Sequence, residues 1–166
     1  MIRLEYQSLS YWKINGFEVY EEAINNVAVT YANTTEGIQA QEIINGSLEA
    51  LRSSEFSEND SFKSFKVIYE FDNIPENGLE DFVKMLDESV KKVAYFNLST
   101  SVDVYNKEKT FVVVHGLKSI EGSQGFIQLL DKEDQKKIKR PFFSISSKNY
   151  RTLQIHKNLD AYKAIQ

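Results

Sequence analysis

The sequence predicts an α+β fold in which a run of short helices precedes a small sheet. Between residues 65 and 147, apolar segments of strand length alternate with longer amphipathic segments, in the order strand, helix, strand, strand, helix, strand. Two of the predicted strands are apolar on both faces and two are not, as expected for central and edge strands of one sheet. This order is that of a ferredoxin-like β-α-β-β-α-β sandwich, which C-terminal helices follow here.

The composition is typical of a globular protein, since 42% of the 166 residues are apolar and 27% are charged. The net charge of −4 comes from acids and bases mixed along the chain, so nucleic acid is not an expected partner. The chain has no cysteine, which excludes disulfides and thiol catalysis. It contains no apolar run of the roughly 20 residues that a membrane span requires, and it opens without a secretory signal pattern. We therefore expect no membrane span.

Residues 1–51 are predicted to form three short helices. Apolar residues recur every three or four positions in 17–31 and in 40–51, which places them on one face of each helix. The third helix is expected to begin near Thr35 or Glu36, where a small polar residue precedes an acidic first turn. Short helices joined by short turns are typical of α-solenoids such as tetratricopeptide repeats, although the full repeat signature is missing.

Residues 52–64 are predicted to link two domains. In this segment serines alternate with acidic residues, and such a composition is too polar to bury much surface. The sequence therefore divides into a helical, tetratricopeptide-like segment at 1–51 and a ferredoxin-like α+β domain at 65–166.

Hydrophobicity separates the central strands of the second domain from its edge strands. The segments 65–71 and 110–115 are apolar on both faces, which is typical of strands inside a sheet. The segment 96–104 alternates apolar with polar residues, and the last strand opens at Pro141, which cannot donate a backbone hydrogen bond. The first and third strands are therefore predicted to be central, and 106–109 to form a hairpin loop between the second and third.

Two crossover helices and a C-terminal tail complete the second domain. The first helix starts after Gly78, and we interpret the acid-base pairs four residues apart on its polar face as solvated surface. These pairs are Glu80 and Lys84, Asp87 and Lys91, and Glu88 and Lys92. The second helix opens at Ser119. From Tyr150 onward, the tail is predicted to form one or two short helices packed on this domain.

The sequence contains no recognisable catalytic, metal or cofactor site. His115 and His156 have no second histidine at ligand spacing, so a structural role is the favoured interpretation of both. No serine lies in a nucleophile-elbow motif, and no glycine-rich loop precedes a helix with a phosphate-binding lysine. We therefore expect no enzyme activity and no cofactor.

Aromatic residues raise two further questions. RNA-recognition domains stack bases on aromatic residues of the central strands, where this chain has Tyr69, Phe71 and Phe111. The basic, glycine-rich context of that motif is absent, so packing against the two helices explains these rings better. On the first predicted helix, Trp12 belongs either to a core or to a surface on which further repeats stack.

Three parts of the chain resemble the C-terminal region of SprE/PorW-like tetratricopeptide-repeat proteins, which act in gliding motility and type IX secretion in Bacteroidetes. They are YANTTEG with AQEI (31–43), TFVVVHGL with its following helix (110–117), and FFSISSKNYRTLQ with HKNLDAY (142–162). The resemblance implies a non-enzymatic scaffold of the periplasm or outer membrane that contacts envelope or secretion proteins. Family members are large lipoproteins, so it also implies a C-terminal fragment or a short relative.

Two functions follow from these observations. The favoured one is a protein–protein interaction scaffold, in which helical repeats and an exposed sheet edge hold partners. Leu98 and Thr100 of the edge strand 96–104 are candidate partner contacts, and Trp12 is a third. The alternative is a ligand-binding module, because sporulation-related repeat domains share the β-α-β-β-α-β order and bind peptidoglycan.

Overall fold

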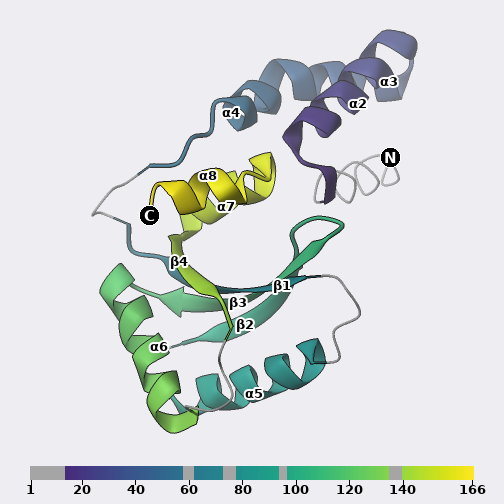
Figure 1. Cartoon of the computed structure of the whole chain (residues 1–166). Helices are drawn as coiled ribbons and strands as arrows, with labels where there is room; N and C mark the ends of the chain where they lie inside the picture. The colour runs from purple at the N-terminus through teal and green to yellow at the C-terminus, as the bar shows by residue number, and fades with distance from the viewer. Residues whose placement is uncertain (1–13, 58–61, 73–77, 94–96, 135–139) are drawn as a thin grey trace. The chain divides into compact units, whose positions relative to one another are not determined.

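In the computed structural model, the chain forms two compact units, one helical and one built on a sheet (Figure 1). The structure describes residues 14–57, 62–72, 78–93, 97–134 and 140–166. The helical unit joins the described residues up to Phe56 with Arg151–Gln166, and the sheet unit is Ser57–Tyr150. The C-terminal tail therefore belongs to the helical unit, whereas the sequence grouped it with the α+β domain.

The helical unit combines an early and a late segment of the chain. Its helices are α2 (Phe17–Thr30), α3 (Thr35–Ile43), the π-helical turn η1 (Ile44–Leu48), α4 (Glu49–Arg52) and α8 (Leu159–Ala164). Helix α7 (Ser147–His156) contributes its part from Arg151 onward. Helix α3 begins where the sequence predicts, because the Thr34 hydroxyl accepts a hydrogen bond from the Gly37 amide at 3.2 Å. A side chain at Gly37 would collide with the backbone of Tyr31, so the junction of α2 and α3 requires glycine.

The apolar faces of these helices and of the tail share one core. Its buried members are Phe17, Tyr20, Ile24, Ala28, Ala40, Leu48 and Ile155. The rings of Phe17 and His156 lie 5.6 Å apart, and those of Phe56 and Tyr162 lie 5.0 Å apart. These contacts group the tail with the helices, because the apolar side chains of the tail complete their core.

The sheet unit has four antiparallel strands in the order β2-β3-β1-β4. Its elements are β1 (Phe65–Asp72), α5 (Leu79–Lys92), β2 (Ser99–Val104), β3 (Lys109–Leu117), α6 (Ile120–Asp134) and β4 (Phe142–Ser146). Helices α5 and α6 lie on the same face of the sheet (Figure 1). The first and third strands are central and the second and fourth are edges, which confirms the prediction from hydrophobicity.

Aromatic rings fill the core between the sheet and its helices. Tyr69 and Phe71 of β1 each lie 5.1 Å from the ring of Phe82 on α5, which confirms that these two rings pack against a helix. The ring of Phe111 does not pack against these helices. Side chains alternate along β3, and the next residue, Val112, belongs to the core between the sheet and the helices, so Phe111 lies on the opposite face. There it is buried and stacks on Tyr105 with ring centroids 4.6 Å apart.

The hairpin between β2 and β3 forms where the sequence predicts. The backbone amides of Tyr105 and Asn106 both donate to the carbonyl oxygen of Lys109. The Asn106 side chain accepts from the Glu108 amide at 2.9 Å, which closes the turn from within.

A β-bulge interrupts β3 near its end. Phe65 pairs with Leu117 and Val67 pairs with Val114, so that Lys66 alone faces two residues of β3, His115 and Gly116. Gly116 has a φ of +94°, and a Cβ there would collide with the carbonyl group of Asn97. The bulge therefore requires glycine at this position.

Three predictions fall outside the described residues, in whole or in part. The first predicted helix lies almost wholly before residue 14, Trp12 lies within that helix, and the predicted linker 52–64 includes residues 58–61. Among the helices that the structure describes, none is long and apolar enough to cross a membrane.

Candidate functional site

The outer side of β2 is an open sheet edge. β3 pairs with β2 along its whole length, from Ser99 opposite His115 to Val104 opposite Thr110, without a bulge. No described strand pairs with the other side of β2, which is the last strand of the sheet. The outward N–H and C=O groups of β2 are therefore placed to pair with a strand of another chain.

Two valines on this edge strand are accessible. Val102 and Val104 are 47% and 50% exposed, and they lie on the face of β2 that α5 covers. Leu98 and Thr100, the two contacts predicted from the sequence, lie on the same face of β2 but contact other residues of the sheet unit. Leu98 packs against the core, and the hydroxyl of Thr100 donates to the Asp87 carboxylate on α5.

Sequence alternation thus identifies the face but not the exposed positions on it. Helix α5 lies over the start of the strand, so that Leu98 and Thr100 have partners within the unit. Val102 and Val104 come later in the same alternating series and remain exposed. The exposed apolar side chains of this edge are therefore the two valines, whereas Leu98 and Thr100 are half-buried.

An open groove of about 470 Å³ runs between β2 and α5. Val102 lines it together with Leu79 and Val83, which are partly buried against the core. Charged side chains of both signs, all from α5, form the rest of its lining: Glu80, Lys84, Asp87, Glu88 and Lys91. The groove therefore offers an apolar contact framed by charges beside an unpaired strand edge.

A polar cluster lies at the β-bulge, on the face of the sheet opposite α5 and α6. Lys66 Nζ lies 2.8 Å from His115 Nδ1, and Ser101 Oγ lies 2.7 Å from His115 Nε2. Ser101 also donates to one carboxylate oxygen of Asp103 at 2.8 Å, and the Tyr150 hydroxyl donates to the other at 2.6 Å. The cluster joins three strands and the first turn of α7. Sequence spacing gave no sign of it, because only strand register and the bulge bring these residues together.

One arrangement of protons satisfies every group of this cluster. The Lys66 ammonium donates to Nδ1 of His115, Nε2–H donates to Ser101, and Ser101 donates to Asp103. Burial and the neighbouring Lys66 lower the pKa of His115, against the opposing effect of Asp103, and burial lowers the pKa of Lys66. In this arrangement the imidazole has no lone pair aimed at Ser101, so the geometry is not that of a serine nucleophile and its base.

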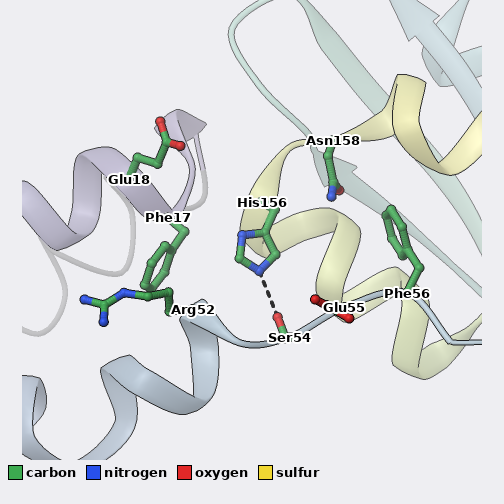
Figure 2. Close-up of a pocket in the computed structure, with 8 residues that line it drawn as sticks. All are labelled: Phe17, Glu18, Arg52, Ser54, Glu55, Phe56, His156 and Asn158. Carbon is green, nitrogen blue, oxygen red and sulfur yellow. Dashed lines mark hydrogen bonds between the residues drawn. The ribbon is translucent and has the colours of Figure 1, made fainter.

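The helical unit holds a pocket of about 400 Å³ around His156 (Figure 2). The Ser54 hydroxyl lies 2.9 Å from His156 Nε2, and Phe17 packs against the same ring. Glu18 and Arg52 also line the pocket, but their charged ends point away from His156 in Figure 2. Arg52 instead forms ion pairs with Glu21 and Glu49. Glu18 and Arg52 are therefore not directed at a ligand shared with His156.

The β2 edge with its groove is the region best suited to hold another molecule, because it combines unpaired backbone, exposed apolar side chains and charges. In the cluster at the bulge, the polar groups bond to one another. Among the described residues, no three histidine or acidic side chains gather as a possible metal site. Comparisons of the chain with protein-family models, with curated proteins and with solved structures found no match.

Proposed function

We propose that this chain is a non-enzymatic protein–protein interaction module whose binding surface is the outer edge of β2 with the groove beside α5. The observation that carries the proposal is a bulge-free edge strand that exposes two valines next to this groove. A strand of another polypeptide would pair with the backbone of β2 and place alternate side chains in the groove. This is recognition by strand addition, in which the backbone supplies affinity and the groove supplies specificity.

The proposed setting is the cell envelope of Bacteroidetes, on the strength of the resemblance of residues 110–117 and 142–162 to SprE/PorW-like proteins. There the chain would act in the periplasm or at the outer membrane, as a scaffold component of gliding motility or type IX secretion. The strand order β2-β3-β1-β4, with both crossover helices on one face, supports a ferredoxin-like assignment of the sheet unit. The helix junction at 31–43 supports the tetratricopeptide-like description of the helical unit.

A photo-crosslinking amino acid at Val102 tests this function. In envelope preparations from cells that make the protein, we expect discrete adducts whose partner mass spectrometry identifies. The matched control is Val29 of α2, also a valine and 80% exposed, which should not yield the same adducts. The proposal fails if probes at Val102 and at Val104 give no protein adduct, or only those seen from Val29.

Peptidoglycan binding is the competing function, and sedimentation with purified peptidoglycan separates the two. An interaction module of the proposed kind should remain in the supernatant. If the Val102→Lys variant still pellets with peptidoglycan, the proposal is contradicted, because the cell wall would then bind a surface other than the β2 edge.

A further inference from the structure

The geometry points to a second copy of this chain as the partner that fits the β2 edge. In the inferred dimer, the two β2 strands pair antiparallel across a twofold axis, and the two α5 helices lie beside each other on the same face. The inference rests on the proposed binding role of the β2 edge, and it names the occupant. Three observations support it: the order of charges on α5, their lack of ion-pair partners among the residues that the structure describes, and the position of the valines.

A stripe of alternating charge runs along the groove side of α5. Glu80, Lys84, Asp87 and Lys91 follow one another at spacings of four, three and four residues, so they lie in one row along the helix. All four line the groove beside β2. The order of signs along the row is acid, base, acid, base.

This order is complementary to itself when two α5 helices lie antiparallel. A twofold axis through the middle of the row places Glu80 opposite Lys91 of the second copy. It also places Lys84 opposite Asp87 of the second copy, and symmetry repeats both pairs. Every facing pair then has opposite sign, which an interface made from two identical patches requires. A parallel arrangement in the same register would instead place like charges together.

The charges of this row are available for such pairs. In the described part of the chain, the ion pairs involve Arg52 and Lys109, and none includes a side chain of α5. The predicted pairs four residues apart on α5 are thus not closed as ion pairs. Of these four side chains, only Asp87 has a hydrogen bond to another described residue, which it accepts from the Thr100 hydroxyl.

β2 supplies the matching contact between strands. Antiparallel pairing centred on Val102 places this residue opposite its own copy, and Thr100 opposite Val104 of the second copy. Such pairing closes both open edges and covers valines that are 47% and 50% exposed. Thr100 bonds to Asp87, and Val102 shares the groove with Lys84. The middle of the strand therefore lies beside the middle of the charged row, so one axis can serve both.

Sedimentation equilibrium of the full chain at low ionic strength, with charge-reversal variants, tests the inference. Glu80→Lys or Lys91→Glu places like charges opposite each other twice per dimer, and each variant should raise the dimer Kd about tenfold. The double variant E80K/K91E restores opposite signs and should recover a Kd within about threefold of the original. The matched controls are Asp81→Lys and Lys92→Glu, neighbours on α5 that do not line the groove and should leave the Kd unchanged.

Two results overturn the inference: a folded chain that sediments as a monomer at every concentration, and a dimer whose Kd fails to respond to the single changes or to recover in the double variant. The first result can coexist with adducts from Val102 to a different protein in envelope preparations. In that case the second-copy inference fails while the proposed interaction function stands. A monomer that also gives no adduct from Val102 or Val104 removes both.

Discussion

The two edges of the sheet are built differently. β2 pairs with β3 without irregularity and exposes Val102 and Val104. β4 is shorter, follows Pro141 directly and passes into α7 without a loop, and its residues Phe143 and Ile145 are buried, although Phe142 at its start is 46% exposed. Because proteins normally protect a sheet edge with short strands, proline or covering elements, β4 has the features of a closed edge and β2 does not. β2 is therefore the edge on which the proposed strand addition depends.

Truncating a buried residue of the closed edge should have the largest effect on stability. Ile145→Ala removes a side chain that is 0% exposed, so we expect the free energy of unfolding to fall by about 2–4 kcal/mol. Val102→Ala on the open edge should lower it by less than about 1 kcal/mol. Urea denaturation of dilute protein measures both, and equal losses would mean that the two edges do not differ as described.

The bulge beside the open edge should be the next most sensitive point. Gly116→Ala forces a Cβ against the carbonyl of Asn97, just before β2, at a φ of +94°. We expect a loss of about 1–3 kcal/mol in the free energy of unfolding. Gly125→Ala is the control, since nothing lies within 4 Å of a Cβ at that position in α6 and the change should stabilise by up to about 1 kcal/mol.

Acid should lower the folding stability of the protein through His115, which lies beside β2. Because the pKa of His115 is lowered in the folded chain, the unfolded chain binds more protons as the pH falls below the ordinary imidazole pKa of about 6.5. The stability that neutral His115 contributes is therefore complete above that pH and is lost below it. Urea midpoints between pH 5 and 8 should show this decline, and His115→Gln should flatten it.

Lys66→Met provides a second check on the same effect. It removes a positive charge that lowers the pKa of His115, so the decline with acid should become shallower but not vanish. A profile that neither variant changes would show that the cluster does not couple protons to folding. Ile145→Ala, at the other edge, should shift all midpoints without changing the shape of the profile.

The smallest effect on stability is expected where binding is most affected. Val102→Lys changes an exposed residue, so the unfolding free energy of the monomer should change by less than about 0.5 kcal/mol. The same change should raise the dimer Kd more than tenfold, because it sets two ammonium groups opposite each other. Leu129→Lys on α6, where the leucine is 43% exposed, should leave the Kd unchanged. A dimer that tolerates Lys at 102 would move the interface away from β2.

Local patterns predicted what depends on neighbours in the sequence. The cap at Thr34, the hairpin loop after Tyr105 and the division into central and edge strands all follow from spacing and polarity. The partner of an apolar face does not follow in the same way. The spacing of Ile155 and the other apolar residues of the tail indicates an amphipathic helix. Nothing in that segment indicates that Ile155 completes the core around Phe17.

The candidate sites were harder to predict for the same reason. Alternation marks Leu98, Thr100, Val102 and Val104 as one face of β2, but only the position of α5 decides which of them remain accessible. The bonds of His115 to Lys66 and Ser101 arise from strand register and from a one-residue bulge. Such long-range placement leaves no spacing signal in the chain.

The shared core of α2 and α7 has a consequence for how the protein is made. A ribosome releases Phe17 before any strand of the sheet unit, but Ile155, which belongs to the same core, is synthesised after the last of these strands. We therefore expect the usual order of cotranslational folding, N-terminal part first, to be reversed here. All four strands of the sheet unit precede Ile155 in the chain, so the leading helices must wait until α7 has been synthesised to find their closing partner.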